Sequence, residues 1–170
     1  MGSHDPFRMA DTNAQQLLFI QQALTEGRRG DALRELQVLL AAQPEHGKAQ
    51  ALYGTILFRH LKDFSGAEEA FRIAMRQAPA YPDLYIEYGE LLLQLDKGTE
   101  TVAILNRALE VPGIAKDKIY RIFGQLYERQ QKWEDAIDYY NRAVFFTLSG
   151  TDMILYQEDL SRVKQKISLQ

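Results

Sequence analysis

The chain has 170 residues, of which 46% are apolar and 25% are charged, and its formal net charge is −3. This length suits one compact domain or a short array of repeats, and so small a net charge excludes nucleic-acid or membrane binding driven by charge alone. The sequence has no cysteine, which excludes disulfides, thiolate catalysis and cysteine-based metal sites.

The first residues, 1–8, read as a vector-derived tag, and we expect the native sequence to start at or near Met9. The residues that follow have no basic start and no long apolar segment, so they do not read as a secretory signal. No apolar run approaches the roughly 20 residues that span a bilayer. We therefore expect a cytoplasmic protein without a membrane span; a signal or anchor removed in cloning would leave no trace in this sequence.

Three glycines, Gly54, Gly89 and Gly124, recur at a spacing of 35 residues, and each follows an aromatic residue. A second pattern also recurs. A small residue is followed after four positions by a large one, after three more by a small one, and then by proline; one copy is Ala67, Phe71, Ala74 and Pro79. These spacings are typical of amphipathic helices. Each repeated unit is therefore predicted to be two helices joined by a short polar turn.

The pattern resembles the tetratricopeptide repeat family, whose units read W-x2-L-G-x2-Y, then A-x3-F, then P. The third unit approximates it as Tyr85-x2-Tyr88-Gly89-x2-Leu92, whereas the first unit has Ile20 in place of the glycine. The resemblance implies an all-α protein, a right-handed α-solenoid of about four helix-turn-helix repeats plus a C-terminal capping helix. Within residues 9–150 the expected repeats are about 13–46, 47–81, 82–115 and 116–149, and the capping helix is expected at 151–170.

Six aromatic residues crowd around Gly124, namely Tyr120, Phe123, Tyr127, Trp133, Tyr139 and Tyr140. They form either a cage for a ligand or the packed core of one repeat. Glycine inside a helix costs about 1 kcal/mol relative to alanine, so close helix packing must offset that cost. We therefore interpret the glycines as structural, and the helical spacing of the aromatic residues favours the core.

Candidate catalytic and metal-binding residues are isolated in this sequence. His46 and His60 have no ligand spacing, and the adjacent carboxylates Glu134 and Asp135 stand at an expected helix start, where they favourably meet the helix dipole. The "GRRG" segment at 27–30 lacks the strand and the Gly-Lys-Ser/Thr context of a phosphate-binding loop. We expect no enzyme activity, no cofactor and no metal site.

One side of each first helix is predicted to line the inner curve of the stack, which solenoids use for binding. Leu24, Phe58 and Leu93 either are buried by a partner helix or peptide or pack against the protein's own helices; the helical phase leaves both open. The candidate groove residues are Leu17, Gln21, Leu24, Lys48, Ala51, Thr55, Phe58, Arg59, Asp83, Ile86, Glu87, Glu90, Leu93, Lys118, Arg121, Gln125, Glu128 and Arg129.

The leading hypothesis is a non-catalytic scaffold or adaptor that binds a peptide or helix of another protein in this groove. A second is self-assembly, such as a homodimer, through the adjacent Phe145 and Phe146. A third hypothesis is a chaperone for a secreted protein, but no residue of the sequence favours it over the other two. Some members of the resembled family bind acidic C-termini of chaperones through a basic cluster; Asp83 and Glu87 at matching positions would repel a carboxylate, so we expect no such clamp.

Overall fold

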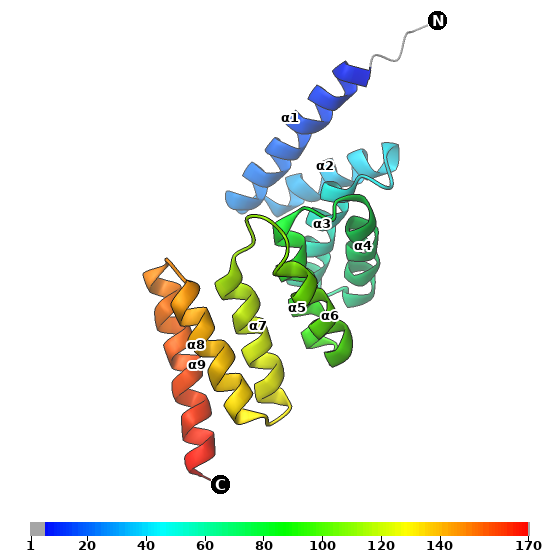
Figure 1. Ribbon diagram of the computed structural model, residues 1–170. Coiled ribbons are helices and arrows are strands. Elements are labelled where there is room, and N and C mark those ends of the chain that lie inside the picture. Colours follow the sequence, from blue (N-terminus) through cyan, green and yellow to red (C-terminus); the bar gives the residue numbers. More distant parts are fainter. Residues whose placement is uncertain (1–5, 170) are drawn as a thin grey trace, which may run out of the picture. The chain divides into compact units, whose positions relative to one another are not determined.

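The computed structural model describes residues 6–169, with side chains from residue 13 onward. Within this range the chain forms nine α-helices, one π-helical turn and no strand, which confirms the prediction of an all-α chain (Figure 1). The elements are α1 (Pro6–Thr25), α2 (Arg29–Ala42), α3 (Gly47–Ile56), η1 (Leu57–Leu61), α4 (Phe64–Gln77), α5 (Pro82–Gln94), α6 (Gly98–Ala108), α7 (Lys116–Arg129), α8 (Trp133–Phe146) and α9 (Gly150–Ser168).

The helices form two compact units, Met1–Pro79 and Ala80–Gln170. In the first unit α1 packs against α2, and α3 packs against α4. In the second unit α5 packs against α6, and α7, α8 and α9 pack side by side, coloured from yellow to red in Figure 1. Successive helices in each unit are therefore paired, as the sequence pattern predicted.

Each unit has its own apolar core. In the first unit Ile20, Leu36 and Ile56 are among the buried residues of one cluster, and Ile20 fills the position where the later repeats have glycine. In the second unit Tyr140 and Val163 belong to a cluster that joins α8 to α9. The spacing of large apolar side chains by three and four positions places them on the buried face of each helix.

Two of the repeated glycines mark the closest approach of one helix to the next. A Cβ atom at Gly54 would lie 2.7 Å from the ring of Phe71, and a Cβ atom at Gly124 would lie 2.6 Å from the ring of Tyr140. Such short separations leave no room for even a methyl group. The rings of α4 and α8 therefore rest directly on the backbone of the preceding helix, and the structural interpretation of these glycines is supported.

The turn inside each helix pair contains one residue in the left-handed backbone conformation. These residues are Gly27, Lys62, Asp96 and Gln131, with φ between 58° and 75°. After three of them the next backbone N–H donates to a carbonyl five residues earlier, with N···O distances of 2.7 to 3.0 Å, which closes the preceding helix. Only one of the four is glycine, so the sequence does not mark the left-handed positions at Lys62, Asp96 and Gln131 with glycine.

The π-helical turn Leu57–Leu61 explains an irregular spacing in the second repeat. Gly54 and Ala67 are 13 residues apart, whereas Gly124 and Ala136 are 12 apart. A π-helix accommodates one additional residue in its hydrogen-bonded ring. The additional residue of the second repeat is therefore absorbed inside the helix, before the turn begins.

Candidate functional site

In the first unit, the predicted groove residues that are apolar lie against its own core. Leu17 and Leu24 are half-buried and pack on the apolar cluster of α1, α2 and α3. The side chain of Phe58 is 3% exposed, meets the ring of Phe64 edge-on and is covered by the Arg59 guanidinium, 4.6 Å from the ring centre. Of the others, Ala51 is buried, Thr55 is half-buried, and Gln21 and Lys48 are exposed.

In the second unit the apolar members of the predicted groove are buried as well. Leu93 is 4% exposed, and its carbonyl oxygen accepts a hydrogen bond of 2.6 Å from Arg129. Of the two alternatives that the sequence left open, packing within the protein therefore holds for Phe58 and Leu93. The remaining members are Ile86 and Glu128, which are buried, Glu87, Glu90, Arg121 and Gln125, which are half-buried, and Asp83 and Lys118, which are exposed.

Two of the predicted groove residues on α7 attach α9 instead. The Arg121 side chain donates to Asp159 at 2.8 Å, and Arg162 joins Asp159 (2.7 Å) to Glu128 (2.8 Å). Lys166 donates to the second carboxylate oxygen of Glu128 at 2.8 Å. We call these five residues the α7–α9 joint. The charges of Arg121 and Glu128 are thus matched by residues of α9.

The joint continues into the core of α7 and α8 through a phenol. The Tyr140 hydroxyl donates to Glu128 at 2.7 Å. Burial acts to raise the pKa of Glu128, but hydrogen bonds from Arg162, Lys166 and Tyr140 outweigh it and lower the pKa to about 2. Burial and the bond to Glu128 raise the pKa of Tyr140. A carboxylate kept ionised beside a phenol kept protonated is typical of a structural pair rather than of an acid–base pair that exchanges protons near neutral pH.

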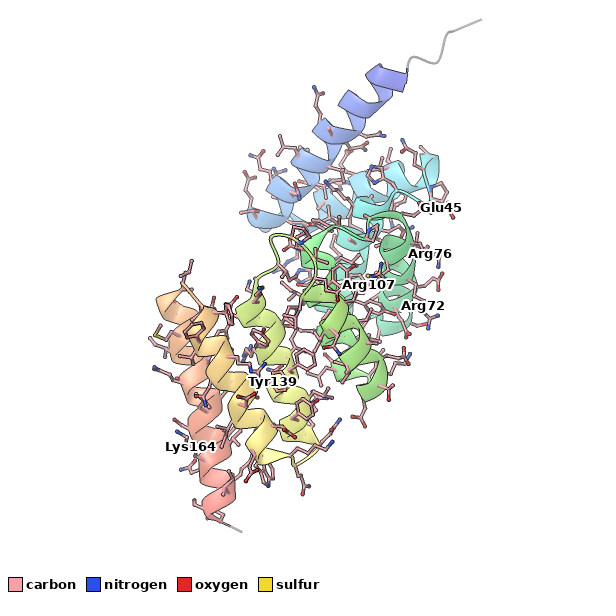
Figure 2. All side chains as sticks on the ribbon, in the orientation of Figure 1. Glu45, Arg72, Arg76, Arg107, Tyr139 and Lys164 are labelled. Carbon is pink, nitrogen blue, oxygen red and sulfur yellow. The ribbon has the colours of Figure 1, made fainter. Side chains whose placement is uncertain are left out.

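Tyr139, one of the aromatic residues that crowd around Gly124 in the sequence, packs against several of the others. The Tyr139 ring, labelled in Figure 2, stacks on Phe123 and Tyr127 with centroid distances of 4.7 and 5.2 Å. Tyr139 also lies 6.2 Å from the ring of Tyr120. Because these rings cover one another's faces, the arrangement supports the core interpretation over the cage.

An open apolar surface lies in the second unit where α8 ends and α9 begins. Phe145 is 80% exposed, Phe146 is 42% exposed, and Leu148 is wholly exposed. Beside them is a hollow of about 420 Å³, which we call the corner hollow. It is lined by Ile114, Ala115, Lys116, Asp117, Lys118, Phe146, Thr147, Leu148 and Ser149. The sequence analysis singled out the phenylalanines but not Leu148 or the hollow.

Of the histidines considered for chemistry, His46 has a structural role. His46 caps α3, its Nδ1 atom accepting from the backbone N–H of Ala49 at 3.3 Å. Burial, followed by the nearby cation of Arg29, lowers the pKa of His60. Among residues 13–169, no three His, Asp or Glu side chains gather closely enough to hold a metal ion. No helix in the described range has both the length and the apolar character needed to cross a membrane.

Comparison with known proteins gives one family and one curated relative. The sequence model of the tetratricopeptide repeat family matches residues 17–82. Protein O-mannosyl-transferase Tmtc1 of Drosophila melanogaster is 31% identical over 98 residues, which are 52% of this chain and 11% of that protein. The chain thus spans only about a tenth of the length of this relative.

Solved structures share the fold. PilF of Pseudomonas aeruginosa aligns with a TM-score of 0.77 at 16% identity, over 92% of this chain and 71% of that one. The first tetratricopeptide repeat domain of Spaghetti (RPAP3), bound to the HSP90 peptide SRMEEVD, aligns with a TM-score of 0.61 at 18% identity, over 72% of this chain and 93% of that one. At such identities the likeness concerns the fold alone.

Proposed function

Because this chain belongs to the tetratricopeptide repeat family, we propose that it is a non-catalytic scaffold that binds a peptide or helix of another protein. Repeats of this kind generally mediate protein–protein interactions. The observation that supports the proposal most is the open apolar surface of Phe145, Phe146 and Leu148 beside the corner hollow. Exposed apolar surface next to a concavity is typical of protein-interaction sites.

The peptide class of partner is supported by the fold. The RPAP3 domain is a neighbour of similar fold that holds a short peptide. In the present chain the exposed polar members of the predicted groove remain part of the proposal as side chains that a partner contacts; they are Gln21, Lys48, Asp83, Lys118 and Arg129. We still expect the predicted groove residues not to clamp a C-terminal carboxylate, because the negative charge of Asp83 would repel it.

A scaffold role also agrees with the positions of the perturbed ionisable groups. Glu128, Tyr140 and Arg162 have shifted pKa values, and all three hydrogen-bond one another between α7, α8 and α9. The joint uses these groups to hold helices together. The transferase name of the Drosophila relative belongs to a protein of which the match covers 11%, so we do not extend that activity to this chain.

A second candidate function, self-assembly, is favoured by the 80% exposure of Phe145. A second copy of the chain could cover this ring and Phe146 in a symmetric contact. Light scattering at increasing concentration distinguishes the two functions: a constant monomer mass removes self-assembly. A dimer that Phe145→Asp converts to monomer would favour it.

The leading proposal is tested by selecting peptides from a displayed library of random sequences on the immobilised chain. We expect enriched peptides that bind the folded chain in solution with a dissociation constant in the micromolar range, about 10⁻⁶ M, by fluorescence polarisation. The matched control is the same selection on the chain unfolded in urea. Absence of any enriched sequence over this control would contradict peptide binding.

A further inference from the structure

The corner hollow combines an apolar wall with cations at its margin. The buried Ile114 lines it, and Phe146, at the end of α8, and Leu148, which follows it, contribute further apolar surface. The exposed lysines Lys116 and Lys118 come from the first turn of α7. The hollow has a volume of about 420 Å³ and is open to solvent, which leaves room for a large side chain of a partner to pack against its apolar wall.

The two lysines leave this margin positive. Among the described residues, neither Lys116 nor Lys118 forms an ion pair; Lys116 lies over the ring of Phe146, with its Nζ atom 5.6 Å from the ring centre. Asp117, which lies between them in sequence, accepts a hydrogen bond of 3.0 Å from the Tyr156 hydroxyl of α9. The N-terminus of α7 adds to the positive potential, because its N-cap residue, Ala115, provides no side-chain acceptor.

We propose that the corner hollow binds an internal segment of a partner protein in which a large apolar side chain is flanked by aspartate or glutamate. This inference rests on the proposed scaffold function and assigns its site. The apolar anchor enters between Ile114, Phe146 and Leu148, and the flanking carboxylates meet Lys116 and Lys118. Charge complementarity of this kind selects the partner and speeds its association.

This site differs from a groove that clamps a C-terminal carboxylate. Of the predicted groove residues only Lys118 lines the hollow, and the anchor is an apolar side chain. The protruding Phe145 and Leu148 would suit lipid as well, so it is the concavity, which a lipid surface would leave unfilled, that favours a peptide. A second copy of the chain is the remaining occupant, and the test separates all three.

The test uses the full chain and peptides selected from the displayed library. Leu148→Asp and Lys118→Glu alter exposed side chains of the hollow, so we expect both variants to keep the circular-dichroism spectrum and melting temperature of the parent. The matched controls are Val38→Asp, another exposed apolar residue, and Lys164→Glu, an exposed lysine of α9 labelled in Figure 2. Binding of each variant is measured by fluorescence polarisation.

We expect the enriched peptides to carry an apolar residue flanked by acidic ones. Leu148→Asp and Lys118→Glu should each weaken their binding about tenfold or more, while the controls change it less than about twofold. The loss in Lys118→Glu should shrink at high salt, because the contact is electrostatic.

Four results would overturn the inference. Equal binding of the enriched peptides to both corner variants would place the site elsewhere and leave the scaffold function standing, whereas failure to enrich any peptide would remove both. Sedimentation with phosphatidylserine–phosphatidylcholine vesicles, lost in Leu148→Asp while no acidic peptide binds, would assign the surface to lipid. A dimer by light scattering that Leu148→Asp dissociates would assign it to a second copy.

Discussion

The second and fourth repeats use the same three positions in different ways. The positions are a glycine, the aromatic ring of the second helix that rests on it, and the residue four places after the glycine. All three are apolar in the second repeat, where they are Gly54, Phe71 and Phe58; in the fourth they are Gly124, Tyr140 and Glu128. The third repeat agrees with the second, since Leu105 packs on Gly89 and Leu93 stands at the last position.

The difference comes from one hydroxyl and one carboxylate. A buried hydroxyl needs a partner, and Tyr140 finds it in Glu128 at 2.7 Å. The buried carboxylate in turn needs cations, which α9 supplies as Arg162 and Lys166. The same packing rule that closes an apolar repeat can therefore also create an attachment site for the next helix, through a connected set of hydrogen bonds.

The largest expected effect follows from making the fourth repeat resemble the third. Glu128→Leu places an apolar residue where Leu93 stands one repeat earlier, but it leaves the Tyr140 hydroxyl buried without its acceptor. Loss of a buried charged partner costs about 3–5 kcal/mol, and we expect about 2–3 kcal/mol here because the cations are half-exposed and can be hydrated. Urea denaturation measures the change in the free energy of unfolding. A matched change at an exposed acidic residue, Glu158→Leu, should alter it by less than about 0.5 kcal/mol.

Acid should weaken the fourth repeat before the second. The pKa of Glu128 falls from an ordinary value of 4.5 to about 2 on folding, so the ionised form stabilises the fold above about pH 4.5. That contribution, about 2 kcal/mol after allowing for exposed partners, is lost as the pH falls from about 4.5 to 2. The protection of the α9 amides, taken relative to the intrinsic exchange rate at each pH, should fall over this range in the parent, and Glu128→Gln should remove most of this pH dependence. Unchanged α9 protection down to pH 2 would count against the joint.

Exchanging the two rings should destabilise both repeats, by smaller amounts. Phe71→Tyr adds a buried hydroxyl where the corresponding residue is Phe58, which cannot accept a hydrogen bond, and should cost about 1–2 kcal/mol. Tyr140→Phe removes one hydrogen bond to the charged Glu128, and should cost about 1–1.5 kcal/mol. Thermal denaturation of each single variant checks both values. If Phe71→Tyr left the melting temperature unchanged, the second repeat would tolerate a buried hydroxyl, and the contrast between the second and fourth repeats would be contradicted.

Much of the repeat architecture could be predicted from the sequence. The spacing of Gly54 and Gly124 and of the rings that pack on them follows from the helical period, which a local pattern contains. Helix starts were also readable, as at Glu134 and Asp135, which lie in the first turn of α8. The residues that join the two helices of one pair are close in sequence, and their spacing recurs from repeat to repeat. This recurrence allowed the contacts within each pair to be predicted.

Contacts between one helix pair and the next element were not readable in the same way. Arg121 and Glu128 look like surface charges, because their partners Asp159 and Arg162 lie more than 30 residues later in the sequence. For Phe58 and Leu93 the sequence left both a groove position and packing within the protein open, because a shift of one residue in phase turns a helix by about 100°. The corner hollow depends on the path of the chain between α8 and α9, for which Leu148 carries no periodic signal.

The central claim is that Tyr140 and Glu128 form one energetic unit that links the fourth repeat to α9. A double-mutant cycle of Tyr140→Phe and Glu128→Leu, measured by urea denaturation, tests it most directly. We predict a coupling free energy of about 1 kcal/mol, because the second change costs less once the hydroxyl that needs an acceptor has been removed. Strict additivity of the two single changes would contradict the claim.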